Sequence, residues 1–238
     1  MKKILTRVLF VIFIFFMIVA TAGAAGLPKR VACVGDSITM GAHLKNPQSE
    51  SYPAVLGQML GAGFDVRNFG VGGATLLRKG DKPYIKQPDY TNALAFKPDI
   101  VVIVLGTNDS KHPGSGSLDS NSAVNNWQNK ADFVSDYQDL IDQFRNANPE
   151  VRVFVGLPPP CFPGRWGINN GTIQNEIIPL IREVSLKTRA GVIDLSPALA
   201  NRQELFPDMV HPNAEGARLI ANTVFKALMN AGLVPSNP

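Results

Sequence analysis

The sequence predicts an α/β fold in which a five-stranded, mainly parallel sheet is covered by helices on both faces. Short runs rich in β-branched residues alternate with longer segments of helical periodicity, and this alternation is typical of parallel sheets with crossover helices. The 238 residues, 45% of them hydrophobic, can fill one domain, and no linker indicates a second. The predicted strands are residues 31–35, 64–69, 100–105, 151–156 and 191–195.

The clearest helix is predicted at about residues 130 to 146, where apolar residues such as Phe133, Tyr137 and Phe144 recur at helical spacing. Asn213 is expected to cap the final helix, because its side chain can accept a hydrogen bond from the first turn. His211 would then lie just before a rigid helix start. Further helices are predicted at residues 52–60, 90–96, 173–187 and 214–230.

The first 25 residues have the pattern of an export signal. Three basic residues precede an apolar run at residues 8–20, which ends in small residues. Cleavage after Ala22, Ala24 or Ala25 would each fit, and the sequence leaves this choice open. An uncleaved membrane anchor is the alternative, but the apolar run is short for a bilayer, which needs about 20 residues. We therefore expect residues 26–238 to be exported to the periplasm or the medium, without membrane contact after cleavage.

The composition excludes several partners and chemistries. The net charge of +4 falls to about +1 when the leader is removed, and no basic cluster indicates nucleic acid. Cys33 lies in an apolar run, so it and Cys161 are expected to be separate thiols, with a disulfide as the alternative in an exported protein. The chain lacks a phosphate-binding loop, a His-Glu-x-x-His helix and a paired-cysteine site, so we expect no cofactor and no metal. The oligomeric state stays open.

Four short stretches contain the groups that serine-based acyl transfer requires. Ser37 supplies a hydroxyl, His211 a base, Asp208 a carboxylate to orient that base, and the Gly73 amide and Asn108 side chain supply oxyanion donors. Taken singly, each stretch can also be explained as a helix cap or a loop. Three of them follow predicted strands, at the sheet edge where ligands collect. The stretches are residues 35–39, 72–73, 106–109 and 208–211.

His211 competes with His43 and His112 for the role of base. His211 has a carboxylate, Asp208, three residues earlier. In a tight turn that carboxylate could accept a hydrogen bond from Nδ1, which leaves Nε2 to take the proton of Ser37. Because His211 also lies just before the start of the predicted final helix, we predict it as the base.

In this order, residues 35–37, Gly73, Asn108 and His211 resemble the four blocks of the SGNH hydrolases, also called the GDSL esterase/lipase superfamily. The resemblance covers essentially the whole mature chain. It implies a flavodoxin-like, three-layer α/β/α sandwich and an esterase that needs no cofactor. It also implies a triad of Ser37, Asp208 and His211, with an oxyanion hole made by the Ser37 amide, the Gly73 amide and the Asn108 side chain.

Residues 68–80, 157–160 and 166–169 look most like exported carbohydrate acetylesterases of this superfamily, including those grouped with sialate O-acetylesterases. The resemblance implies an O-acylated, above all O-acetylated, carbohydrate or small molecule as substrate. Trp166 could stack on a sugar ring and Arg78 or Lys79 could meet a carboxylate, the alternatives being a loop anchor and solvated charges. A lysophospholipase or acyl thioesterase stays open, as does a noncatalytic glycan-binding protein, which we rank lower.

Overall fold

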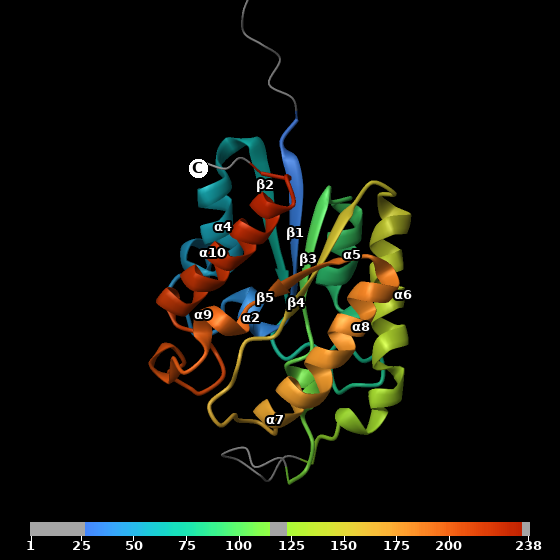
Figure 1. Cartoon of the computed structure of the whole chain (residues 1–238), viewed down its shortest axis with the longest axis vertical. Coiled ribbons are helices and arrows are strands. Elements are labelled where there is room, and N and C mark those ends of the chain that lie inside the picture. Colours follow the sequence, from blue (N-terminus) through green and yellow to red (C-terminus); the bar gives the residue numbers. More distant parts are fainter. Residues whose placement is uncertain (1–26, 115–122, 235–238) are drawn as a thin grey trace, which may run out of the picture.

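The computed structural model describes residues 27–114 and 123–234, which form an α/β/α sandwich around one sheet (Figure 1). The strand order is β2-β1-β3-β4-β5, and every neighbouring pair is parallel. The five predicted strands are confirmed, with ends that differ by at most two residues. The predicted leader lies outside the described residues. The strands are β1 (Lys29–Gly35), β2 (Phe64–Gly70), β3 (Ile100–Val104), β4 (Arg152–Leu157) and β5 (Gly191–Asp194).

Helices cover both faces of the sheet, as predicted (Figure 1). One face carries α4 (Tyr52–Leu60) and α10 (Ala214–Asn230), and the other carries α5 (Pro88–Ala95), α6 (Phe133–Ala147) and α8 (Ile178–Thr188). The shorter α-helices are α2 (Ser37–Met40), α3 (Pro47–Glu50), α7 (Asn170–Thr172) and α9 (Ser196–Leu199). The 3₁₀ turns are η1 (Gly61–Gly63), η2 (Tyr84–Lys86), η3 (Asn108–Ser110), η4 (Trp127–Asp132) and η6 (Gln203–Leu205), and η5 (Ile173–Ile177) is a π-helix.

The central strand β3 explains why two hydrophobic cores form. All five of its residues are buried. Because successive side chains of a strand point to opposite faces, Val101 and Ile103 pack toward α6 and α8, whereas Val102 and Val104 pack toward α4 and α10. The unbroken apolar sequence of β3 is thus the expected pattern for a strand covered on both sides.

One predicted helix is interrupted. The segment predicted as continuous from residue 173 begins as the π-helix η5 before α8 starts at Ile178. Pro179 lies in the first turn of α8. Proline has no amide hydrogen and its ring crowds the carbonyl one turn earlier, so a wider turn before it relieves the clash. Periodicity alone did not reveal this change.

Candidate active site

Ser37 is the first residue of α2, just beyond the end of β1. Asp36 caps this helix, because its Oδ1 accepts a hydrogen bond from the Ile38 amide at 2.9 Å. A Cβ at Gly35 would lie 2.1 Å from Thr39 Oγ1, so only glycine allows the chain to turn this tightly between strand and helix. The helix-cap explanation therefore applies to Asp36 and leaves the Ser37 hydroxyl available to other groups.

The structure brings Ser37, His211 and Asp208 into one hydrogen-bonded chain. His211 Nε2 lies 2.8 Å from Ser37 Oγ, and His211 Nδ1 lies 2.7 Å from Asp208 Oδ2. The other carboxylate oxygen, Oδ1, accepts from the backbone amides of Val210 and His211 at 3.0 and 2.7 Å. Asn213 caps α10 as predicted, which places His211 before a fixed helix start. Residues separated by more than 170 positions thus meet at one edge of the sheet.

The other two histidines lie at different distances from the hydrogen-bonded residues Ser37, His211 and Asp208. His112 follows Asp109 at the same three-residue spacing, but that carboxylate accepts from the Leu76 and Leu77 amides. His112 Nε2 lies 3.2 Å from Thr172 Oγ1 instead. His43 Nε2 lies 3.5 Å from Asp208 Oδ2, and its ring centroid is 4.9 Å from that of His211. His43 has no carboxylate close in sequence, so its approach to Asp208 was not predicted.

Burial and hydrogen bonding set the charges of His211 and Asp208. Burial lowers the pKa of His211 below its ordinary 6.5, which outweighs the opposing effect of Asp208, and the nearby His43 lowers it further. Partial burial acts to raise the pKa of Asp208, but the hydrogen bonds from His211 and Val210 outweigh it and hold that pKa below its ordinary value. At neutral pH a neutral imidazole therefore faces an ionised carboxylate, as a general base and its orienting group require.

The two sequence-predicted oxyanion donors line the same cavity as Ser37 and His211. This cavity has a volume of about 280 Å³. Gly73 has a φ of +77°, a conformation that favours glycine. Asn108 is buried in η3, directly after the β3 loop, and its Nδ2 donates to the Ala74 carbonyl at 3.1 Å. Because a side-chain amide has two N–H groups, a second donor remains beside the cavity.

Trp166 also lines this cavity, at its exposed side. Its side chain is 38% exposed, and its ring centroid lies 5.5 Å from that of His211. The Arg165 guanidinium lies 5.1 Å from the centroid of the Trp166 ring. A second cavity of about 490 Å³ adjoins the first through His43 and His211.

Arg78 and Lys79 take a different position. Arg78 forms ion pairs with Asp136 and Asp139 of α6, at 3.8 and 3.0 Å, and Lys79 Nζ lies 2.8 Å from Asp132 Oδ2. Neither residue lines the cavity that contains Ser37. The structure thus places these two cations against carboxylates of the chain itself.

Asp109, the last residue of the third stretch, contacts the chain just after Gly73, and no role was predicted for it from the sequence. It is fully buried, and its carboxylate accepts from the backbone amides of Leu76 and Leu77 at 3.0 and 2.8 Å. Burial raises its pKa to about 6, although these two amides oppose the rise. Its position directly after Asn108, at the end of a buried strand, was the available signal. A polar side chain that is buried there needs hydrogen-bond partners.

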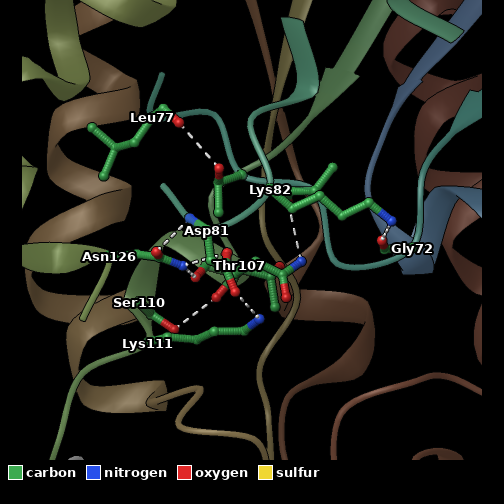
Figure 2. Close-up of polar contacts among 11 residues, drawn as sticks. Gly72, Leu77, Asp81, Lys82, Thr107, Ser110, Lys111 and Asn126 are labelled. Atoms are coloured by element: carbon green, nitrogen blue, oxygen red, sulfur yellow. Dashed lines mark hydrogen bonds and ion pairs between the residues drawn. The ribbon is translucent and has the colours of Figure 1, made fainter. Parts of the chain in front are cut away.

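A polar network links Asp81, Asn126 and Lys111 (Figure 2), and Asn126 connects it to the Asn108 carbonyl. The buried Asn126 donates through Nδ2 to the Asn108 carbonyl and to Asp81 Oδ1, both at 2.9 Å, and its Oδ1 accepts from the Asp81 amide at 2.8 Å. Lys111 Nζ lies 3.2 Å from the other Asp81 oxygen and lines the cavity of Ser37. Lys82 Nζ donates to the Gly72 carbonyl at 2.8 Å. No sequence motif marked these four side chains.

The described residues contain one set of side chains close enough to share a metal ion. His43, Asp208 and His211 offer ligand atoms that all lie within 4.8 Å of one another. Two of these residues belong to the hydrogen-bonded chain of Ser37, so a metal there would compete with the Asp208–His211 hydrogen bond.

The two cysteines agree with a further expectation. Cys33 and Cys161 are both free and buried, and burial raises the pKa of each thiol to about 12. The prediction of two separate thiols is confirmed. Within residues 27–114 and 123–234, every helix is too short or too polar to span a bilayer.

Comparison with known families and sequences gives two findings. The profile of the GDSL-like lipase/acylhydrolase family matches residues 33–219, a range that contains all four stretches. An acetylxylan esterase from Xylanibacter ruminicola is 36% identical over 217 residues, which cover 84% of this chain. The chain spans 43% of the length of that relative.

Solved structures show the same architecture. A carbohydrate acetylesterase from Sinorhizobium meliloti aligns with a TM-score of 0.64 and 18% identity, over 85% of this chain and 99% of that one. An aryl esterase from M. smegmatis aligns with a TM-score of 0.61 and 20% identity, over 87% of this chain and 100% of that one. At these identities the likeness concerns the fold.

Proposed function

Because the chain belongs to the GDSL-like lipase/acylhydrolase family, we propose that it is a serine esterase that removes O-acetyl groups from carbohydrates. The observation that carries this proposal is the hydrogen-bonded chain from Ser37 Oγ through His211 to Asp208, at 2.8 and 2.7 Å. A hydroxyl that contacts a neutral imidazole, itself oriented by a carboxylate, has the arrangement of an activated nucleophile.

In the proposed reaction, His211 Nε2 takes the proton of Ser37 Oγ while this oxygen attacks the ester carbonyl carbon. The resulting oxyanion receives hydrogen bonds from the Ser37 amide, the Gly73 amide and the Asn108 side chain. His211 then gives the proton to the departing sugar oxygen, which leaves acyl-Ser37. Water attacks this acyl group as His211 takes its proton, and return of the proton to Ser37 Oγ releases the acid. The side chains and backbone amides of the protein supply every group in these steps, so no cofactor is required.

Three observations support an acetylated carbohydrate as the substrate. The 36% identical relative is an acetylxylan esterase. The cavity beside Ser37 is small, at about 280 Å³, which suits a short acyl group. Trp166, at the exposed side of that cavity, presents an aromatic ring on which a sugar could stack. Arg78 and Lys79 are not part of this proposal, because their charges are paired with Asp139 of α6 and Asp132 of η4.

The test is acetate release from a panel of acetylated sugars and xylan fragments, set against hydrolysis of esters with acyl chains of two to twelve carbons. Protein spanning residues 26–238 and its Ser37→Ala variant are assayed in parallel. We expect acetate release from acetylated carbohydrate and its loss in the variant. Acetate release that survives in Ser37→Ala would overturn the mechanism.

The same panel separates the alternatives. A lysophospholipase or acyl thioesterase would prefer long chains, because each buried methylene adds about 0.8 kcal/mol of binding. A noncatalytic glycan-binding protein would bind the sugars with and without Ser37 and release no acetate. Either result would replace the proposed substrate class.

We propose further that residues 1–25 direct export and that residues 26–238 form one catalytic domain. Three basic residues followed by a short apolar run support the first point. The mass of the exported protein tests it, because cleavage should expose an N-terminus just after Ala22, Ala24 or Ala25. A protein that keeps its first residues and stays with the membrane would support an anchor instead.

A further inference from the structure

Lys82 contacts the peptide group that carries one of the proposed oxyanion donors. Its Nζ donates to the Gly72 carbonyl oxygen at 2.8 Å (Figure 2). The Gly72 carbonyl and the Gly73 N–H belong to one planar peptide unit, in which the nitrogen lone pair is shared with the carbonyl. A cation at the oxygen withdraws electron density from the nitrogen, so the Gly73 N–H becomes a stronger donor. We infer that Lys82 is a positioning residue that strengthens the oxyanion hole through this peptide.

This inference rests on the proposed function and adds a residue to it. In a trans peptide the carbonyl and the N–H point in opposite directions. Fixing the Gly72 oxygen on Lys82 therefore also fixes the direction of the Gly73 N–H, beside the cavity that Ser37 and Asn108 line. The contact acts on both the orientation and the strength of the donor.

The chain around Lys82 is held in place by its backbone. The Thr75 amide donates to the Lys82 carbonyl at 2.9 Å, and the Tyr84 amide donates to the Thr75 carbonyl at 2.9 Å. A Cβ at Gly80 would lie 2.3 Å from Thr75 Oγ1, so the two segments approach as closely as glycine permits. The backbone of Lys82 is thus held beside Thr75, which lies two residues after Gly73.

The charge of Lys82 is not neutralised by the nearest carboxylate in sequence. Asp81 accepts from Asn126 at 2.9 Å and pairs with Lys111 at 3.2 Å. In the described part of the chain, Lys82 takes part in no ion pair, and its contact is the Gly72 carbonyl. The ammonium group of Lys82 therefore interacts with the Gly72–Gly73 peptide without a competing carboxylate.

The same loop also holds the second proposed donor. Asn126, which binds Asp81, donates to the Asn108 carbonyl at 2.9 Å. Asp81 and Lys82 are consecutive, so one short segment is linked to both proposed donors. Lys82 contacts the Gly72–Gly73 peptide with a charged group, whereas Asp81 is linked to Asn108 through the neutral amide of Asn126.

The first test compares Lys82→Met with Lys86→Met, which removes the same charge from an exposed site four residues later. Loss of a whole oxyanion donor costs a hundredfold to a thousandfold in rate, so loss of its polarisation should lower kcat by about three- to tenfold. KM should stay within about twofold, because the oxyanion forms in the transition state. Lys82→Arg should restore most of kcat, and Lys86→Met should match the unmodified protein.

The second test does not depend on activity. We expect the ¹⁵N and ¹H signals of the Gly73 amide to move upfield in Lys82→Met and to stay in place in Lys86→Met. An unmoved Gly73 signal, or an unchanged kcat in Lys82→Met, would overturn the inference. If the unmodified protein releases no acetate, the proposed function is wrong. The Gly73 signal then still decides whether Lys82 polarises the Gly72–Gly73 peptide.

Discussion

Asp208 holds His211 through both carboxylate oxygens. Oδ2 lies 2.7 Å from the ring Nδ1, and Oδ1 accepts from the His211 backbone amide at 2.7 Å. Between them Met209 adopts a φ of +74°, which closes the turn tightly enough for both contacts. The carboxylate therefore fixes the backbone, the ring orientation and the tautomer of His211 together.

Asp208→Asn should lower kcat about 10⁴-fold, the effect known for the equivalent change in a serine protease triad. The amide would favour the tautomer whose Nε2 carries a proton and cannot accept one from Ser37. Steady-state kinetics on an acetylated substrate measures the effect. Asp65→Asn, which alters a surface ion pair with Arg67, serves as the control. A loss below tenfold in Asp208→Asn would show that Asp208 is dispensable for orienting His211.

The acid limb of the pH profile should lie below pH 6.5. The base must be neutral, and burial lowers the pKa of His211, so kcat/KM should rise with pH through that lowered pKa and then level off. His43 adds to this lowering when it is charged, because its ring lies 4.9 Å from that of His211. His43→Gln should therefore move the limb to higher pH and keep most of the maximal rate. An unmoved limb would exclude this electrostatic effect.

Asn108→Ala should reduce kcat about a hundredfold to a thousandfold while KM changes little, since the amide acts on the oxyanion. The variant also loses the hydrogen bond to the Ala74 carbonyl, so circular dichroism and thermal unfolding should accompany the kinetics. An unchanged kcat in a folded variant would remove Asn108 from the oxyanion hole.

The central strands could be predicted because they are apolar on both faces. Residues 100–104 read Ile-Val-Val-Ile-Val, and so short a run of β-branched residues between loops favours a buried strand. The parallel order then places the ends of β1, β2 and β3 at one edge, which is why Ser37, Gly73 and Asn108 could be grouped before their positions were known.

The supporting contacts could not be predicted, for a physical reason. Lys82 reaches Gly72 across a loop, and Asn126 reaches Asn108 from a segment 18 residues away. Such contacts depend on how loops fold over the sheet edge and leave no periodic signal. The prediction for Arg78 failed in the opposite way. We considered it as a partner for a substrate carboxylate, but it pairs with Asp139 of α6.

Asp36→Asn should stabilise the protein at alkaline pH. Asp36 is fully buried, and burial raises its pKa to about 7, although hydrogen bonds from the Ile38 amide and the Thr107 hydroxyl oppose the rise. The folded state therefore binds this proton more tightly than the unfolded state, and stability falls as pH rises from the ordinary pKa of 3.8 through 7.

Asparagine keeps the acceptor for the Ile38 amide and removes the buried charge. The melting temperature of Asp36→Asn should exceed that of the unmodified protein at pH 8 by about 3 °C or more, the shift that roughly 1 kcal/mol gives in a domain of this size. The gain should shrink at pH 5. An equal gain at both values would show that Asp36 does not titrate in this range.

Trp166→Ala should raise KM for an acetylated oligosaccharide about three- to tenfold, which corresponds to roughly 1 kcal/mol of stacking on the ring. The same variant should change KM for a small aryl acetate little, because such a substrate reaches Ser37 without covering Trp166. Trp166→Phe is the matched control, since it keeps an aromatic face at the exposed side of the cavity. Equal losses on both substrates would mean that Trp166 acts by packing against His211, 5.5 Å away, and not by binding the sugar.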